Sequence, residues 1–459
     1  MRAARDITRH RFPELIFLCL CTLMVTVWFA GGASRADMLG QLVVRGMAWL
    51  MLAVAIMLGA FPSARSARIP LGFLMVCIAL PCLQLIPLPP KLWLLLPGHA
   101  PFAEAASLAR MPQPWRPIAI VPGAAINAAG SLIVPFSTLF LAAGVTRGQR
   151  AMLPGVVLAL AASSALVGAL QFCGAGLPNP LINYTPGEVS GTFANRNHFA
   201  LLEAIGCVVA PAWAFMGDKQ SRWRAPLAFA LLPVFILLIL ASGSRAGMML
   251  GAAALTTGVL LSHKWLNLKF RTHASWSSPA LPIGIIGMVA IVVVASVLSH
   301  RANSIDRLLS LAPSDDLRAR NLRTVWSIIW TYFPVGSGFG GFDPLFRLHE
   351  PFSALQLTYF NHAHNDFAEV VLDGGLPALL LIIAAVAWWA SASLRLLRAP
   401  ASRETLLPRL GATVLFLIFA ASLFDYPVRT PMIMMITALA ALWLGRGVPD
   451  TRGATLPSR

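Results

Sequence analysis

Long apolar runs follow one another along most of the chain, with short polar connections between them. A helix that crosses a hydrocarbon layer about 30 Å thick satisfies its own backbone polar groups and needs roughly 17 to 25 apolar residues. About twelve runs meet this requirement, so the pattern predicts an all-α, polytopic membrane protein. The expected spans are 15–31, 41–61, 69–89, 126–146, 152–172, 199–216, 225–242, 245–263, 281–299, 367–390, 410–424 and 430–445.

Composition agrees with lipid as the solvent, because 57% of the 459 residues are hydrophobic and only 12% are charged. The net charge of +17 could suggest a nucleic-acid partner. The basic residues are instead scattered through short connections rather than gathered on one domain, which argues against nucleic acid. We expect them to contact anionic membrane lipid.

Arginine and lysine alternate between connections as the positive-inside rule requires. With a cytoplasmic N-terminus, every second connection is basic, which predicts an even helix count and two cytoplasmic termini. The basic groups are Arg2/Arg5/Arg9/Arg11, Arg65/Arg68, Arg147/Arg150, Lys219/Arg222/Arg224, Lys264/Lys269/Arg271, Arg395/Arg398/Arg403/Arg409 and Arg446/Arg452. We therefore expect one membrane domain, 1–459, in a bacterial inner membrane. The first span resembles a secretory signal, but its length and the alternation favour a retained anchor.

The connection 300–366 is long enough to suggest function, and we expect it to be a large periplasmic loop that carries short helices. Residues 316–333 have a helical pattern and predict an interfacial helix with Leu322, Val325, Trp326, Ile329, Trp330 and Phe333 on one face. The glycine-rich stretch 336–341 follows. No strand precedes it and no Lys-Ser/Thr follows it, so tight turns are expected rather than a phosphate-binding loop.

Four polar clusters fall on the predicted periplasmic side, although tens to hundreds of residues separate them. Their shared sidedness suggests that they surround one site. The clusters are Ser190–His198, Ser242–Gly247, Asn361–Asp366 and Asp425–Arg429.

Each cluster also has a structural interpretation. Arginines at helix ends often anchor the helix at lipid headgroups. Asp366 and Glu369 match the N-cap and N3 positions of a capping box. His362, His364 and Asp366 have spacings that could converge on zinc, although we expect no metal and no other cofactor. These alternatives stay open at the level of sequence.

The four clusters supply several guanidinium groups and histidines, but no acidic pair is evident among them. Guanidinium forks suit the oxygens of a diphosphate. A histidine suits proton removal from a hydroxyl near neutral pH. The combination favours group transfer from a lipid diphosphate to a hydroxyl.

These residues resemble the O-antigen ligase-like family, which includes O-antigen ligases and polymerases of lipid-linked polysaccharides. The resemblance is carried by 191–200, 244–247, 333–340, 361–366 and 374–377. The family's ligase signature places a glycine ten residues after a His-Asn pair and a small residue three further on; His364-Asn365 and Gly375 fit it. Ala378 stands where glycine or a comparable residue is usual.

The resemblance implies metal-independent, inverting glycosyl transfer at the periplasmic face. The glycan donor would be an undecaprenyl-diphosphate-linked glycan, and the acceptor a hydroxyl of lipid A core or of another glycan chain. It implies His364, Arg245 and Arg196 as catalytic residues. Further substrate-binding candidates are Asn197, His198, Arg318, Arg320, His362 and Asn365.

A flippase for lipid-linked glycans, or another polysaccharide transporter, is the main alternative. Transporters usually place ionisable groups near the bilayer midplane. Here the spans carry almost no charge apart from Arg45 near one end of its span and Glu203 early in another. A sensor or scaffold would not need four converging polar clusters.

Overall fold

A computed structural model describes residues 2–60, 65–216, 223–272, 294, 317–352, 355 and 360–447, without the side chains of 2–12, 263–272 and 317–320. The helices are α1 (Arg2–Ala30), α2 (Leu39–Met57), α3 (Arg68–Gln84), α4 (Pro90–Trp93), α5 (Ala100–Leu108), α6 (Pro122–Ser131), α7 (Ile133–Gly144), α8 (Arg147–Phe172), α9 (Arg196–Phe215), α10 (Arg224–Ala241), α11 (Arg245–Thr272), α14 (Leu317–Tyr332), α15 (Phe342–His349), α16 (Asp366–Arg398), α17 (Arg403–Ser422) and α18 (Pro431–Leu444), with short 3-10 helices η1 (Arg65–Ala67) and η4 (Pro427–Arg429).

Ten segments of these helices are long and apolar enough to cross a membrane, and α18 is a shorter apolar helix. The ten segments and α18 account for eleven of the twelve predicted spans. The remaining one, 281–299, lies outside the described residues. The all-α, polytopic fold class is therefore confirmed.

Helix α9 lies at the centre of the bundle and is buried along its whole length by α8, α10, α11 and α17. Small residues allow this close approach, because a Cβ on Gly168 of α8 would lie 2.5 Å from the ring of Phe199. A second group, α1, α2 and α7, joins the first through α18, which contacts both α7 and α17.

The basic connections gather at one end of the bundle. Nε2 of Gln149 donates to the carbonyl of Pro13 at 3.1 Å, and Arg147 pairs with Glu404 at 3.3 Å. The backbone of Gly445 also approaches that of Ser66. The shared side that the arginine pattern predicts is thus confirmed for these connections, while their cytoplasmic location stays a prediction.

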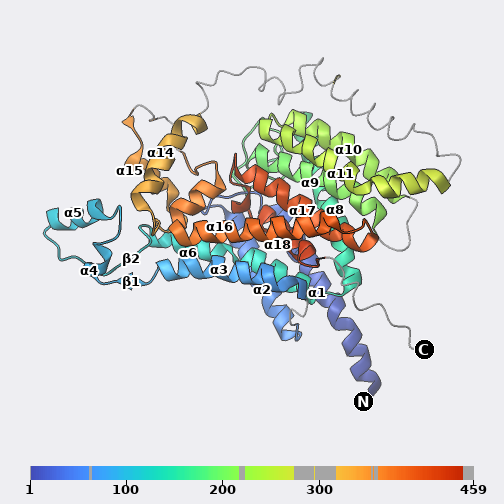
Figure 1. Ribbon diagram of the computed structural model, residues 1–459, viewed down its shortest axis with the longest axis horizontal. Helices are drawn as coiled ribbons and strands as arrows, with labels where there is room; N and C mark the ends of the chain where they lie inside the picture. Colours follow the sequence, from blue (N-terminus) through green and yellow to red (C-terminus); the bar gives the residue numbers. More distant parts are fainter. Residues whose placement is uncertain are drawn as a thin grey trace.

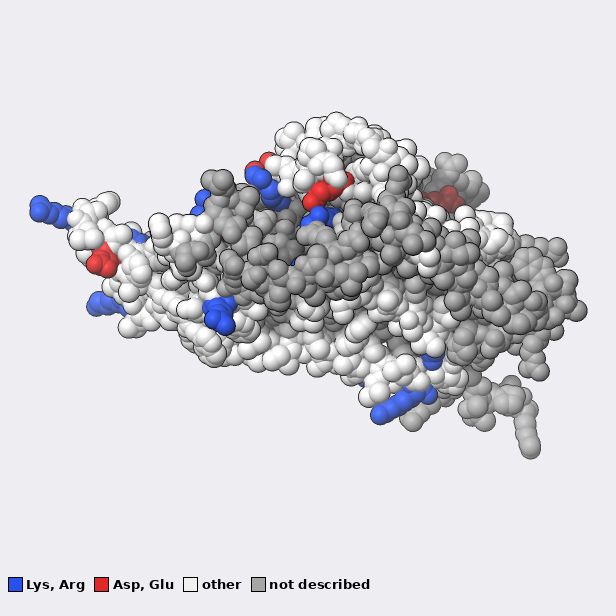
Figure 2. Space-filling model, turned by 90° about the horizontal axis from the view of Figure 1, so that it is seen from above, with Lys and Arg blue, Asp and Glu red and all other residues white. Residues whose placement is uncertain are grey.

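The opposite end carries the described non-spanning elements α4, α5, α14 and α15 (Figure 1). Here β1 (Pro87–Leu88) pairs antiparallel with β2 (Arg116–Pro117), a hairpin that the sequence did not predict. Charged side chains are few over the described part of the face seen in Figure 2, and some extend from the tip where α4 and α5 project.

The predicted interfacial helix is present as α14, but its apolar residues are divided between two faces. Val325 and Ile329 are buried against α15 and α16, whereas Trp326 and Trp330 are exposed. The prediction that these residues share a single apolar face is therefore wrong.

The glycine-rich stretch after α14 forms tight turns that pack on a kink in α16. Gly375 has a φ of 58° inside that helix, where a Cβ would lie 2.2 Å from the carbonyl oxygen of Pro334. The amides of Ser337 and Gly338 donate to the carbonyls of Leu372 and Asp373 at 3.0 and 2.9 Å. These bonds replace helical ones at the kink and confirm the interpretation as turns.

Candidate active site

His364 lies on the loop that enters α16, and Asp425 follows α17. Nδ1 of His364 is 3.0 Å from Oδ1 of Asp425. Oδ2 of Asp425 also accepts from Nδ2 of Asn195, at 3.2 Å, and from Nδ2 of Asn197. Because an ionised carboxylate only accepts, Nδ1 of His364 donates and Nε2 is left as the basic nitrogen. Three segments distant in sequence thus meet at one carboxylate.

The backbone also fixes His364 in place. Its φ of 50° lies in a region that residues other than glycine seldom adopt, and such residues cluster at functional sites. The following residue, Asn365, caps α16 by accepting from the amide of Ala368 at 3.0 Å, and it donates to the carbonyl of Leu423 at 3.1 Å. Asn365, predicted to bind substrate, therefore makes structural contacts on both sides of its amide.

The ring of Tyr426 lies among three histidines. Its centroid is 4.3 Å from that of His362, 4.9 Å from that of His364 and 5.2 Å from that of His198. Both His198 and Tyr426 are buried. The aromatic contacts limit how far these imidazoles can turn.

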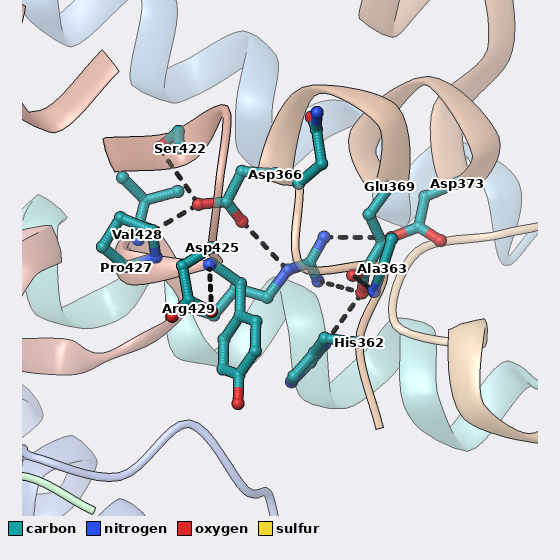
Figure 3. A network of polar contacts seen from close by, with 12 residues as sticks. His362, Ala363, Asp366, Glu369, Asp373, Ser422, Asp425, Pro427, Val428 and Arg429 are labelled. Atoms are coloured by element: carbon teal, nitrogen blue, oxygen red, sulfur yellow. Dashed lines mark hydrogen bonds and ion pairs between the residues drawn. The ribbon is translucent and has the colours of Figure 1, made fainter. Parts of the chain in front are cut away.

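Beside these rings, Arg429 of η4 reaches three carboxylates on successive turns of α16 (Figure 3). Nε lies 3.3 Å from Asp366, Nη1 3.2 Å from Glu369 and Nη2 3.7 Å from Asp373. The three carboxylates are almost fully buried. Burial by itself lowers the pKa of Arg429, but the carboxylates raise it overall to well above its usual value. Arg429 is therefore permanently charged.

Glu369 connects this network to the histidine loop. Its Oε1 lies 2.9 Å from Nδ1 of His362, and its Oε2 accepts from the amide of Ala363 at 2.8 Å. Asp366 accepts from the hydroxyl of Ser422 and the amide of Val428. The carboxylates of α16 thus hold both the loop before that helix and the turn after α17.

Two expectations from the sequence are wrong here. The N-cap of α16 is Asn365 rather than Asp366, and Glu369 accepts from His362 and Ala363 instead of completing a capping box. The expected lack of an acidic pair is also wrong, because the site gathers three carboxylates around Arg429 and a fourth beside His364.

His362 and His364 turn toward different carboxylates, Glu369 and Asp425. Within the part of the chain that the structure describes, no three His, Cys, Asp or Glu side chains form a group that could hold a metal ion. The described geometry is that of separate imidazole–carboxylate pairs.

The predicted catalytic arginines both stand at helix starts at this end of the bundle. Arg196 begins α9 between the two asparagines that reach Asp425, and it pairs with Glu188 at 3.1 Å. Arg245 begins α11. The first turns of α9 and α11 are in contact, since a Cβ on Gly247 would lie 2.4 Å from that of Ala200. Arg196, Arg245 and His364 therefore belong to adjoining elements.

The other predicted substrate-binding residues differ in how much of their surroundings the structure describes. His198 is buried on the first turn of α9, with Nε2 3.5 Å from Nδ2 of Asn195. Asn197 donates to Asp425. Arg318 and Arg320 lie at the start of α14, where the side chains are outside the described residues.

Sequence reasoning missed the roles of Asp425 and Arg429. Both belong to a polar cluster that it singled out, but neither was selected as a site residue. A charged pair between two apolar spans was the available signal.

A comparison with protein families matches residues 228–383 to the family described as O-antigen ligase. A comparison with curated proteins gives no match. The matched segment includes Arg245, His362 and His364 together with the carboxylates of α16. The family is associated with glycosyl transfer of the O-antigen ligase or polymerase type, acting on lipid-linked glycan. Residues 228–383 of this multi-pass membrane protein are therefore similar to the O-antigen ligase family, in agreement with the resemblance seen in the sequence.

Proposed function

We propose that the protein transfers a glycan from an undecaprenyl-diphosphate carrier to an acceptor hydroxyl at the periplasmic face of the inner membrane. The observation that carries the proposal is the His364–Asp425 pair, with Nδ1 and Oδ1 3.0 Å apart, next to the first turn of α9. Asp425 orients the imidazole so that Nε2 faces the acceptor. This is the arrangement that general base catalysis requires.

In the proposed step, the acceptor oxygen attacks the anomeric carbon while its proton passes to Nε2 of His364. The bond from that carbon to the diphosphate oxygen breaks, and the bonding electrons leave with the lipid diphosphate. Asp425 stabilises the imidazolium that forms. The acceptor is lipid A core or another glycan chain.

The leaving diphosphate gains charge as the bond breaks, so groups that bind this charge accelerate the step. Arg196 and Arg245 stand on adjoining helix starts, where the helix dipoles also favour an anion. Glu188 holds Arg196 until the diphosphate competes for its guanidinium.

The direct test is glycan transfer by the purified protein, with a synthetic undecaprenyl-diphosphate glycan and acceptors with and without lipid A core. Transfer with release of undecaprenyl diphosphate supports the proposal. Transport of the lipid across a vesicle membrane without any transfer would contradict it and favour a flippase.

The side of the membrane on which the site lies needs its own test. Reporter fusions at residues 185 and 350 should report the periplasm, and a fusion at 400 should report the cytoplasm. A cytoplasmic signal at 350 would place the site on the wrong side for this chemistry.

A further inference from the structure

Arg45 is a charged residue within a membrane-length helix that the proposed reaction does not use. It lies six residues after Leu39, the first residue of α2, and its guanidinium reaches α6. Nη1 donates to Oδ1 of Asn127 at 2.7 Å, and Nη2 donates to Oε1 of Gln41 at 3.2 Å. Gln41 is buried and is itself held by a bond from its Nε2 to the carbonyl of Ala33, 2.7 Å away. The guanidinium is therefore fixed by neutral amides.

Among the described residues, no acidic side chain pairs with Arg45. The ion pairs that arginines form there all belong to other arginines. The Nε atom of Arg45 is buried and has no hydrogen-bond partner among the described residues. A guanidinium at such a depth is costly unless an anion accompanies it. The site thus suits a negative group that the described residues do not supply.

The position of Arg45 indicates how that group arrives. At a rise of 1.5 Å per residue, it lies about 9 Å from the start of α2. Exposed apolar side chains flank it on both helices, with Leu42 73% exposed on α2 and Ile126 61% exposed on α6. This surface faces lipid in a membrane, so the ligand reaches Arg45 from the bilayer.

Arg45 also belongs to the end of the bundle that holds the candidate active site. The amide of Gly40, next to the start of α2, donates to Leu181 in the loop before α9. Ala124, on the first turn of α6, lies beside Gly340, whose amide donates to Asp373 at 3.2 Å. The helices that carry Arg45 and Asn127 are therefore linked to the loop before α9 and to the carboxylate network.

We propose that Arg45, held by Gln41 and Asn127, binds a phosphate group of a lipid that enters from the bilayer beside α2 and α6. The inference rests on the proposed function, under which this lipid is the polyprenyl diphosphate of the glycan donor. A planar guanidinium fixed in advance binds phosphate oxygens bidentately and loses little freedom in doing so.

The test compares lipid binding by the full-length protein and its Arg45→Gln variant in nanodiscs of phosphatidylcholine. The probes are undecaprenyl diphosphate without sugar and phosphatidylglycerol. We expect Arg45→Gln to weaken undecaprenyl diphosphate binding about ten- to a hundredfold, the scale of a lost charge-assisted hydrogen-bond pair. Binding of phosphatidylglycerol should change by less than about threefold.

Arg409→Gln is the matched control. Arg409 also lies six residues into its helix, α17, and also has a buried Nε without a partner among the described residues. It donates, however, to the carbonyls of Leu396 and Ala399 at the end of α16, where the helix dipole is negative. It lies at the opposite end of the bundle, so its loss should leave undecaprenyl diphosphate binding unchanged.

The outcomes separate this inference from the proposed function. Equal binding of undecaprenyl diphosphate by the unaltered protein and Arg45→Gln overturns the inference alone. Equal weakening of both lipids overturns its diphosphate specificity. An unaltered protein that binds undecaprenyl diphosphate no better than phosphatidylglycerol contradicts the proposed function as well.

A second measurement needs no variant and so does not depend on folding. Phenylglyoxal modifies accessible guanidinium groups, and mass spectrometry locates the modified residues. Undecaprenyl diphosphate should slow modification of Arg45 at least about fivefold relative to the neutral alcohol undecaprenol. Equal modification with both lipids would overturn the inference.

Discussion

The two ends of the helix bundle use arginine in opposite ways. At one end, Arg429 is 18% exposed and holds three buried carboxylates. At the other, Arg147 is 73% exposed and pairs with Glu404, which is 57% exposed. Burial, followed by the nearby Arg147 and Arg150, lowers the pKa of Arg446 there. The first end concentrates opposite charges away from water, whereas the second holds neighbouring arginines and an exposed ion pair.

The comparison teaches that residue type alone says little about role. A buried ion pair leaves uncompensated charges when one member is removed, and this is strongly destabilising. An exposed pair contributes little because water and salt screen it. Substitutions at the two ends should therefore differ in both size and kind.

The largest effect is expected at His364. His364→Ala should reduce glycan transfer about 10²- to 10⁴-fold, the usual contribution of a general base. Arg147→Ala, at the opposite end, should leave the rate within about twofold. Both rates are measured on purified protein with saturating acceptor. Near-normal transfer by His364→Ala would remove this histidine from the mechanism.

Arg429→Met should lower the free energy of unfolding by about 3 to 5 kcal/mol, because three buried carboxylates lose their cation. The matched exposed variant Arg147→Met should cost less than about 1 kcal/mol. Denaturant unfolding in mild detergent measures both. Equal stability losses would show that the two ends do not differ as their burial indicates.

Asp425→Asn separates orientation from proton transfer. The amide keeps the shape of the carboxylate but cannot stabilise the imidazolium, so transfer should fall about ten- to a hundredfold. The KM for the glycan donor should stay within about threefold. A change confined to that KM would assign Asp425 to substrate binding instead.

Arg245→Lys tests whether an arginine at a helix start does more than anchor the helix. Lysine keeps the charge and reaches the headgroup layer, but it loses the planar fork, so transfer should fall about tenfold if Arg245 binds diphosphate. Arg147→Lys is the control at the other end and should be silent. Unchanged transfer by Arg245→Lys would support simple anchoring.

The smallest effect is expected from chelation. His362 and His364 face separate carboxylates, so a chelator should leave the transfer rate of the unaltered protein unchanged within error. The assay is repeated with and without chelator, followed by added zinc. A loss that zinc restores would revive the zinc interpretation of His362, His364 and Asp366.

The sequence by itself determined most of the long apolar helices, although not their caps, and the gathering of the polar clusters at one end of the bundle. Each helix must satisfy its own backbone in lipid, so the signal is local and can be read from one apolar run. The sidedness of the arginines is likewise a property of consecutive connections. The motifs around His364 and Arg245 also indicated the family.

Only the tertiary structure decided which charges meet. His364 finds Asp425 61 residues away, and Asn195 reaches the same carboxylate across 230 residues. The capping interpretation of Asp366 and Glu369 failed for the same reason, because Arg429 comes from beyond the next helix. Such pairings depend on helix packing and on the kink at Gly375, which no local pattern encodes. Periodicity is fixed along one helix, whereas a charge finds its partner only after the helices pack.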